Sequence, residues 1–376
     1  MKANRAAWID APYADLVVRE SERPAAGPNQ VVVEVRALAV NPLDAIVQSN
    51  GRVMYRWLPY PVVMGEDVAG VVVEVGEDVV GFHAGDRVVA YAMGLEKGRD
   101  AVGGGGFQAY VAVEAAMTSP VPDSMALEDA VVLPLAFSTA AAGLFEAAQL
   151  GLDYSRLGAA ANRDDVVVVW GGATSVGGNA IQLARAAGYR VVATASPRHH
   201  DRIRRLGAEA VFDYRDPDVV EQIVAGVRGC RVVGVLAVAV GSAEPCVKIA
   251  RATGARRVAM ASPPVSFYDQ PRRAGLSLAR LALFARLGLR SALLQVRSRI
   301  AGITPSFIWG SSIATSPVGP AVWQSYLPTA LASGIHQTFP PPKIVGDDLS
   351  AIQRAVDTLR DGVSAEKLVI TLGATG

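Results

Sequence analysis

The sequence has few of the residues that bind metal ions. It contains 2 cysteines and 4 histidines in 376 residues. No cysteine precedes Cys230, and His83 is the only histidine among the first 198 residues. A catalytic zinc needs three protein ligands, and a structural zinc needs four, typically thiolates. The sequence therefore predicts no metal site, and we expect His83 to lie in a surface turn.

Charge and targeting signals are also scarce. The net charge is +1 and charged residues make up 19% of the chain, so nothing marks it as a nucleic-acid binder. Residues 1–10 lack the apolar stretch of a secretory signal. Cys230 and Cys246 belong to no paired motif, and we expect them to be buried, reduced thiols in a cytoplasmic protein.

What the chain does have is a β-branched run followed by a glycine-rich turn. Residues 166–170 read Val-Val-Val-Val-Trp, which is typical of a strand buried on both faces. The turn at 171–178 precedes a helical pattern, and its small residues let the backbone approach an anion. Its spacing is G-x-x-T-x-x-G instead of G-x-G-x-x-G, so a tight turn without a ligand is the alternative. We expect a pyrophosphate cradle here.

Strands and helices alternate after this turn. Apolar strand patterns occur at 190–195, 210–212, 231–240 and 257–260, with helical patterns at 198–206, 217–228 and 243–252 between them. This alternation predicts right-handed βαβ crossovers and a doubly wound parallel sheet.

The end of the second strand indicates which dinucleotide is bound. An NAD site usually has an acid there for the ribose 2′-hydroxyl. This chain has Ser196, Arg198 and His199 instead, with Arg202 one turn further on. A hydroxyl and cationic side chains suit a 2′-phosphate, which favours NADP(H) over NAD(H). The alternative is that these arginines form a solvated helix face.

The first third of the chain has a different pattern. Short strands at 31–37, 68–75, 86–91 and 107–113, separated by glycine and proline turns, indicate an antiparallel barrel-like structure. A helix at 348–361 and a strand at 366–372 close the chain. We therefore predict an α/β protein in which a Rossmann doubly wound domain (134–314) is inserted in a β-rich catalytic domain (1–133 and 315–376).

Several motifs resemble those of the medium-chain dehydrogenase/reductase superfamily. They are Asn41-Pro42-Leu43-Asp44, Met64 to Val72, Gly85 to Val88, Gly106 to Tyr110 and Glu366 to Val369. Leu135 to Thr139, Ala195 to Pro197 and Phe212 to Pro217 resemble the zinc-free enoyl reductase branch, which includes trans-acting enoyl reductases of fungal polyketide synthases. The resemblance implies that the β-rich domain is GroES-like. The positions of the first cysteine and the histidine of zinc-containing relatives hold Asn41 and Glu66.

The resemblance also implies roles for individual residues. Those implied to bind the cofactor are Leu43, Gly172, Ala173, Thr174, Ser175, Val176, Ser196, Arg198, His199, Tyr214 and Met260. Those implied to act in catalysis are Asn41, Asp44, Tyr55 and Thr139. Structural alternatives stay open: Asp44 as a turn residue, Thr139 as a helix N-cap, and Tyr55 or Tyr60 as a tyrosine that packs a loop.

These roles lead to an expected activity. We expect NADPH-dependent, zinc-independent reduction of an activated C=C bond, with an enoyl thioester, free or bound to a carrier protein, as the first choice of substrate. A quinone oxidoreductase is the alternative within enzymes. A non-catalytic NADP-binding scaffold or sensor is the alternative from another class.

Two features depart from the family pattern. Ile46 stands where polyketide-serving relatives often carry a lysine. Residues 276–300 form a predicted arginine-rich helix, with Leu276, Leu283, Leu287 and Leu294 on one face. A covering helix or dimer contact is favoured for it, ahead of a docking surface for an acidic carrier, and a membrane-surface helix is least favoured. A homodimer would form through an edge strand at 306–309.

Overall fold

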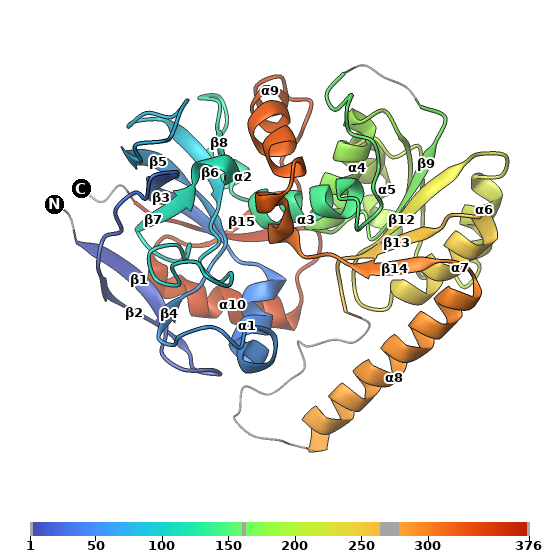
Figure 1. The fold of residues 1–376 in the computed structure, drawn as a ribbon, viewed down its shortest axis with the longest axis horizontal. Coiled ribbons are helices and arrows are strands. Elements are labelled where there is room, and N and C mark those ends of the chain that lie inside the picture. Colours follow the sequence, from blue (N-terminus) through green and yellow to red (C-terminus); the bar gives the residue numbers. More distant parts are fainter. Residues whose placement is uncertain (1–2, 160–162, 264–277, 374–376) are drawn as a thin grey trace. The chain divides into compact units, whose positions relative to one another are not determined.

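The computed structural model describes residues 3–159, 163–263 and 278–373 (Figure 1). The described chain forms two compact units. The first takes in residues 1–135 and 319–376, and the second takes in 136–266 and 276–318, apart from the undescribed residues.

The first unit is built on two sheets. A small antiparallel sheet pairs β1 (Asn4–Ile9) with β2 (Leu16–Ser21) and β4 (Val62–Val63). The larger sheet has the strand order β15-β16-β3-β5-β6-β8, and β7 also pairs with β3. Its strands are β3 (Gln30–Ala39), β5 (Asp67–Val75), β6 (Arg87–Tyr91), β7 (Tyr110–Glu114), β8 (Thr118–Pro120), β15 (Pro342–Gly346) and β16 (Lys367–Thr371). Because β16 and β5 flank β3, the two ends of the chain share one sheet.

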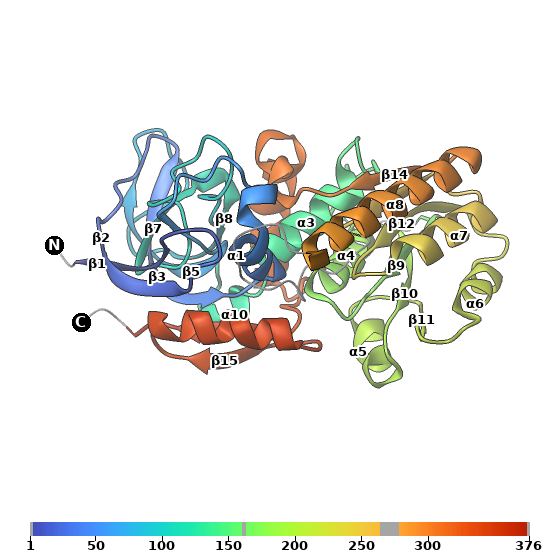
Figure 2. The ribbon, with the colours of Figure 1, turned by 90° about the horizontal axis from the view of Figure 1, so that it is seen from below.

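Two helices far apart in sequence cover part of this unit. They are α1 (Pro42–Met54) and α10 (Ile352–Asp361), which lie side by side in both views (Figures 1 and 2). The guanidinium group of Arg360 on α10 donates hydrogen bonds to the side chains of Gln48 and Ser49 on α1, at 3.0 and 2.5 Å. The short helices α2 (Leu127–Ala130) and α9 (Leu327–Ala332) complete the unit.

The second unit contains the predicted doubly wound sheet. Six strands are all parallel, in the order β11-β10-β9-β12-β13-β14. They are β9 (Val166–Trp170), β10 (Arg190–Thr194), β11 (Ala210–Phe212), β12 (Val232–Ala237), β13 (Arg257–Met260) and β14 (Thr304–Phe307). All five residues of β9 are buried, as expected for a central strand of a parallel sheet. The α/β class and the doubly wound topology predicted from the sequence are confirmed.

Helices connect these strands. They are α4 (Ser175–Ala186), α5 (His200–Arg205), α6 (Val219–Gly226) and α7 (Ala243–Thr253). One hydrophobic cluster joins Val166, Val168 and Trp170 of β9 to Ile223 of α6 and Ile249 of α7. This cluster also contains Leu294 of α8 (Leu278–Ile300), which lies beside α7 (Figures 1 and 2).

Residues 127–145 form the most apolar helical stretch that the structure describes by length and composition together. Residues 127–145, which include α3 (Pro134–Phe145), are long and apolar enough to cross a membrane, and 78% of the stretch is buried inside the protein. No other helix of the described residues meets this test. The burial accounts for the composition, because core helices are apolar on every side.

Several sequence-based expectations are wrong in detail. The strand predicted at 107–113 begins only at Tyr110, because Phe107 and the N–H of Ala109 form backbone hydrogen bonds with Ala7 and Arg5 of the smaller sheet. Thr139 is not an N-cap, since α3 begins at Pro134.

Three further corrections concern the second unit. The edge strand predicted at 306–309 spans Thr304–Phe307, because the chain turns into a 3-10 helix at Gly310. The helix predicted from residue 198 begins at His200, after a 3-10 turn that starts with Pro197. Cys230 is half-buried in a turn, where Arg190 donates a hydrogen bond to its Sγ at 3.3 Å, whereas Cys246 is buried as predicted. Leu276 lies outside the described residues.

Candidate active site

The start of α1 carries the first group of predicted site residues. Asn41 is the N-cap, and Oδ2 of Asp44 accepts a hydrogen bond from the Asn41 backbone N–H at 2.7 Å. This pair forms a capping box, which satisfies donors that the helix leaves without intrahelical partners. The structural alternative for Asp44 is therefore realised, because its carboxyl closes the first turn of α1. Leu43, in the same turn, is half-buried.

A buried ion pair adjoins this turn. Nζ of Lys367 lies 2.8 Å from Oδ2 of Asp67 and also donates to Oδ1 of Asn41. Nδ2 of Asn41 donates to the same Asp67 oxygen at 2.9 Å. The other oxygen of Asp67, Oδ1, accepts from the backbone N–H of Leu135 at 2.7 Å, in the first turn of α3. Lys367, Asp67 and Asn41 thus form one closed network beneath the start of α1.

Glu66 adds a further carboxyl to this network. It is 1% exposed, and its Oε2 has no hydrogen-bond partner among the described residues. Burial raises its pKa well above the usual value, and the negative charges of Asp44, Glu96 and Asp67 act in the same direction. Burial likewise raises the pKa of Asp44 to about 7, against the hydrogen bond from Asn41. Burial and the neighbouring carboxyls therefore both favour the protonated form of Glu66.

Tyr55 lies close enough to these carboxyl groups for their charges to affect its pKa. It is the C-cap residue of α1 and is 1% exposed. Burial raises the pKa of its hydroxyl, and Glu66, Glu96 and Asp44 raise it further. Tyr55 therefore keeps its proton at any pH near neutrality.

The predicted pyrophosphate cradle lies in the second unit, between β9 and α4. Thr174 is the N-cap of α4, and its Oγ1 accepts from the backbone N–H of Gly177 at 3.0 Å. The backbone N–H groups of Ser175 and Val176, in the first turn, have no acceptor within the helix. A Cβ on Gly177 would lie 2.2 Å from the carbonyl oxygen of Gly171, so only glycine allows the helix to approach the strand this closely.

Small residues complete this cradle. Gly171 adopts φ 86°, in the left-handed region that favours glycine. A Cβ on Gly172 would meet Ile181, Ala193 and Ile203 at 3.1 to 3.3 Å. Ala173, the remaining residue of the turn, is half-buried. The turn therefore presents backbone N–H groups at a helix N-terminus, which is the arrangement that binds anions.

The predicted 2′-phosphate residues follow β10 on the same edge of the sheet. Ser196 is nearly buried, and Arg198 and His199 lie in the 3-10 turn after it. Nε of Arg198 lies 3.1 Å from Nε2 of His199. Burial lowers the pKa of His199, and the positive charges of Arg198 and Arg202 lower it further. Arg198 and Arg202 thus place positive charge after β10, where it would stabilise an anion.

The other predicted cofactor residues also lie at the carboxyl ends of strands. Tyr214 follows β11 and is 40% exposed, and Met260 ends β13. The strand order reverses between β9 and β12, and ligands of open α/β sheets bind outside the carboxyl ends of the strands at such a point. Thr139, in the middle of α3, is nearly buried, and a Cβ on Gly310 would lie 2.4 Å from its Oγ1.

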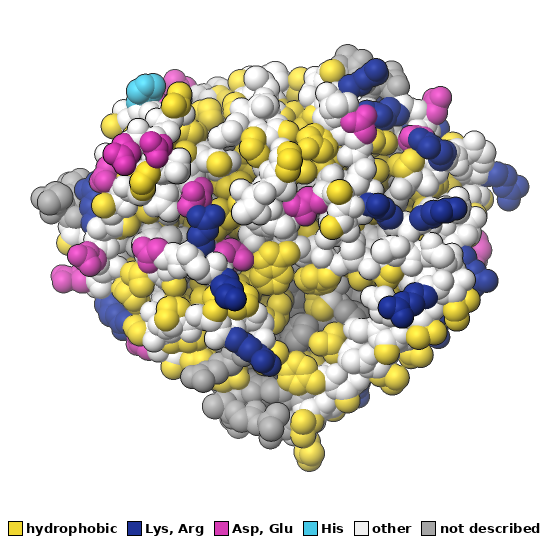
Figure 3. Space-filling view, in the orientation of Figure 1, with side chains coloured by type: hydrophobic (Ala, Val, Ile, Leu, Met, Phe, Trp, Pro, Cys, Tyr) yellow, Lys and Arg dark blue, Asp and Glu magenta, His cyan; other side chains and the backbone are white. Residues whose placement is uncertain are grey.

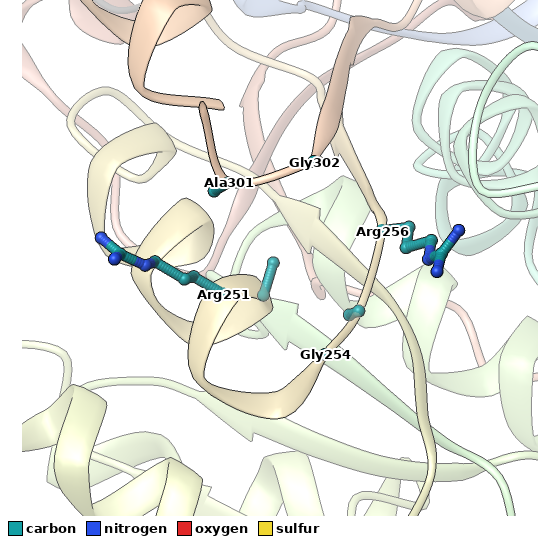
Figure 4. Close-up of a pocket in the computed structure, with 7 residues that line it drawn as sticks. Arg251, Gly254, Arg256, Ala301 and Gly302 are labelled. Atoms are coloured by element: carbon teal, nitrogen blue, oxygen red, sulfur yellow. The ribbon is translucent and has the colours of Figure 1, made fainter. Parts of the chain in front are cut away.

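The second unit also has a hollow that does not lie at the carboxyl ends of the strands. It measures about 300 Å³ and is lined by Ala250, Arg251, Gly254, Ala255, Arg256, Ala301 and Gly302 (Figure 4). Arg251 and Arg256 point away from each other there. The hollow lies before β13 and β14, at the amino ends of the strands, which is the edge opposite to the cradle.

The structure thus gathers the predicted residues into two groups. Asn41, Asp44 and Tyr55 lie around the buried acids of the first unit, whereas the cradle residues and Thr139 belong to the second unit. Sequence reasoning assigned no role to Glu66, Asp67 or Lys367. The available signal is a charged residue at the first position of a strand whose next residues are apolar, as at Asp67 in β5 and Lys367 in β16.

Comparisons with known proteins agree with this architecture. Residues 27–123 match the model of the alcohol dehydrogenase GroES-like domain. The chain is 39% identical to the dehydrogenase pigH of Monascus ruber over 374 residues. This alignment covers 99% of this chain and 100% of that protein. It is 36% identical over 371 residues to the trans-enoyl reductase himH of Aspergillus japonicus, which covers 98% and 97% of the two chains.

A solved structure extends the likeness to the fold. The alcohol dehydrogenase superfamily protein of Novosphingobium aromaticivorans matches with a TM-score of 0.70 at 26% identity, over 98% of this chain and 100% of that chain. The chain therefore belongs to the medium-chain dehydrogenase/reductase superfamily, a family of oxidoreductases that use a nicotinamide cofactor.

Proposed function

We propose that this oxidoreductase reduces an activated C=C bond with NADPH and without zinc, and that its substrate is an enoyl thioester. The relative from Aspergillus japonicus is named a trans-enoyl reductase, which supports the reaction class. The residues of the chain support the cofactor and the absence of a metal.

One observation carries the proposal: the ammonium group of Lys367 donates a hydrogen bond to Asn41 and forms an ion pair with Asp67. A cation of the protein itself therefore lies beside Asn41, which stands where zinc-containing relatives have a cysteine. A zinc ion at Asn41 and Glu66 would need three ligands from Cys, His or carboxylate. Asn41 offers an amide that is already bonded on both sides, to Lys367 and to Asp67. Among the described residues, no group of three His, Cys, Asp or Glu side chains is arranged to hold a metal ion. The donor set does not fit zinc.

The pyrophosphate cradle and the residues after β10 are the evidence that favours NADPH, a nicotinamide dinucleotide with a 2′-phosphate, as the cofactor. The first turn of α4 and the turn from Gly171 to Thr174 fit a pyrophosphate, through backbone N–H groups and the helix dipole. Ser196, Arg198 and His199 would hold the 2′-phosphate, because no acid stands at the end of β10 to accept a hydrogen bond from a ribose hydroxyl. Tyr214 would lie beside the adenosine.

The reduction adds a hydride to the β-carbon and a proton to the α-carbon of the alkene. When bound, the cofactor supplies the hydride. The charge that develops on the carbonyl oxygen must be stabilised by donors that hold their protons. Glu66 and Tyr55 are the candidates for this role, since burial raises the pKa of each and so favours its protonated form. Either side chain would then donate a hydrogen bond or a proton to the enolate.

Parallel turnover assays test this proposal. The purified full chain would be given NADPH together with crotonyl-coenzyme A, a free enone or a quinone, and NADPH oxidation would be followed in each case. We expect the highest kcat/KM for the thioester, and chain-length variants would then define the acyl group. Turnover of the quinone alone would overturn the thioester and favour a quinone oxidoreductase. Tight NADPH binding without turnover of any acceptor would favour the non-catalytic scaffold.

A further inference from the structure

Helix α8 has two apolar faces, and only one of them is covered. Leu283, Leu294 and Ser298 are buried and lie on one side of the helix. Leu283 and Leu294 also belong to the apolar face that the sequence predicts for this helix. On the opposite side six large apolar side chains are between 45% and 86% exposed: Leu278, Leu281, Leu289, Leu293, Val296 and Ile300.

The exposed side chains form one continuous ridge. They recur at helical spacing from residue 278 to residue 300, and the exposed Ala282, Ala285 and Ala292 fill the gaps between them. At 1.5 Å per residue the ridge is about 34 Å long. In Figure 3 the lower right margin, which follows α8 in Figure 1, is lined with apolar side chains. A ridge of this size is larger than the scattered apolar residues of an ordinary surface.

Arginines flank this ridge. Arg286, Arg290 and Arg297 follow one side of it, and Arg299 lies on the other side. Residues 278–300 contain no acid. Arg297 lies 3.7 Å from Glu244 of α7, but both side chains are more than 60% exposed, so this pair is weak. The ridge is therefore apolar at its crest and cationic along its flanks.

The charges argue against a second copy of the chain as the occupant. If two α8 ridges faced each other across a two-fold axis, the arginine row of one would lie beside arginines of the other. This holds for parallel and antiparallel pairing alike, because α8 carries only cations. Like charges at such a contact are destabilising. The occupant must itself be apolar at the contact and anionic around it.

We propose that α8 binds the surface of an anionic lipid bilayer, with its ridge among the acyl chains and its arginines at the headgroup phosphates. Protein interfaces usually centre on aromatic anchors, whereas the crest of this ridge contains only aliphatic side chains. A bilayer requires only apolar area and positive charge, and guanidinium groups bind phosphates in bidentate fashion. The covered face holds the helix on α7, so α8 lies along the membrane surface and does not cross it.

Vesicle sedimentation tests the proposal. The purified full chain would be mixed with vesicles of phosphatidylcholine alone, or of phosphatidylcholine and phosphatidylglycerol in equal parts. We expect the protein to sediment with the mixed vesicles and to be released as salt is raised. Leu289→Asp/Val296→Asp should abolish binding, and Arg286→Gln/Arg299→Gln should lower the partition coefficient roughly 30-fold. Val80→Asp is the matched control, because Val80 is 91% exposed in the other unit.

Three outcomes would overturn the proposal. The first is that the chain does not sediment with the mixed vesicles, and the second is that Val80→Asp weakens sedimentation as much as the ridge variants. The third is that the ridge variants fail to bind vesicles but also convert a dimer to a monomer in analytical ultracentrifugation, which would assign the ridge to contacts between copies. Since Leu289 and Val296 are exposed, thermal unfolding should show that their substitution leaves the fold intact.

Discussion

The ammonium group of Lys367 lies 2.8 Å from Oδ2 of Asp67, and both side chains are buried. Lys367 begins β16 and Asp67 begins β5, and these strands flank β3 in the larger sheet. Residue 39, at the end of β3, is paired with both Asp67 and Val369, which brings the two charges together. The pair holds Asn41 and, through Asp67, the first turn of α3.

Lys367→Met should be strongly destabilising, because it leaves the carboxylate of Asp67 buried without its cation. We expect the free energy of unfolding to fall by about 3–5 kcal/mol in urea denaturation. Lys343→Met is the matched control, since Lys343 lies 3.3 Å from Glu366 in a pair that is about half exposed. Its loss should cost only about 0–1 kcal/mol. Equal effects of the two substitutions would contradict a buried ion pair between Lys367 and Asp67.

The pKa of Asp44 predicts how stability depends on pH. Burial raises this pKa from 3.8 to about 7, so the folded protein binds the proton more tightly than the unfolded chain. The contribution of Asp44 to the free energy of unfolding therefore falls as the pH rises from about 4 to about 7, and it is constant above that. Asp44→Asn keeps a neutral group there and should flatten the slope between pH 5 and 7.

Denaturation curves at several pH values would measure this slope. Asp216→Asn serves as the control, because hydrogen bonds from Asp218 and Gln222 lower the pKa of Asp216. Its contribution changes only at lower pH, so the slope between pH 5 and 7 should match that of the wild type. An unchanged slope in Asp44→Asn would contradict the raised pKa.

Glu66→Gln tests whether the buried carboxyl of Glu66 supplies a proton. Glutamine keeps the size and the hydrogen-bonding capacity of the protonated acid but cannot give up a proton as readily. If Glu66 protonates the α-carbon, kcat for the enoyl thioester should fall by roughly 10²–10⁴-fold, with little change in NADPH affinity. Glu77→Gln, at an exposed position of the same unit, should leave kcat unchanged. A wild-type kcat in Glu66→Gln would assign the proton to Tyr55 or to water.

Arg198→Ala tests the choice of cofactor. The loss of a hydrogen bond to a charged phosphate should raise the Kd for NADPH by roughly 10- to 100-fold. The Kd for NADH should change little, because NADH lacks the phosphate. Fluorescence titration would measure both constants, with Arg228→Ala, exposed elsewhere in the second unit, as the control. An equal loss of affinity for both cofactors would contradict the phosphate contact.

The sequence predicts local features of this protein well. Four β-branched residues in a row identify β9 as a central strand, and the glycine-rich turn after it marks the start of α4. Both features depend on residues that are close together in the chain. The Rossmann half of the fold is built mostly from such features, so its strands and helices could be placed to within a few residues.

Long-range contacts could not be predicted in the same way. The pairing of Lys367 with Asp67 depends on the register of two strands with a third, which no local pattern specifies. In the first turn of α3, the backbone N–H of Leu135 donates a hydrogen bond to the distant Asp67. No local pattern therefore marks the start of α3 at Pro134, and this is why the sequence leaves Thr139 open as an N-cap. In α8 both sides are apolar, and the sequence cannot say which of them is covered.

Metal content and turnover measured on the same sample test directly whether the enzyme works without zinc. The purified full chain would be dialysed against a chelator, analysed for zinc, and assayed with NADPH and an enoyl thioester. We expect no stoichiometric zinc and the same kcat before and after dialysis. One zinc ion per chain, together with activity that is lost on chelation and restored by zinc, would contradict it.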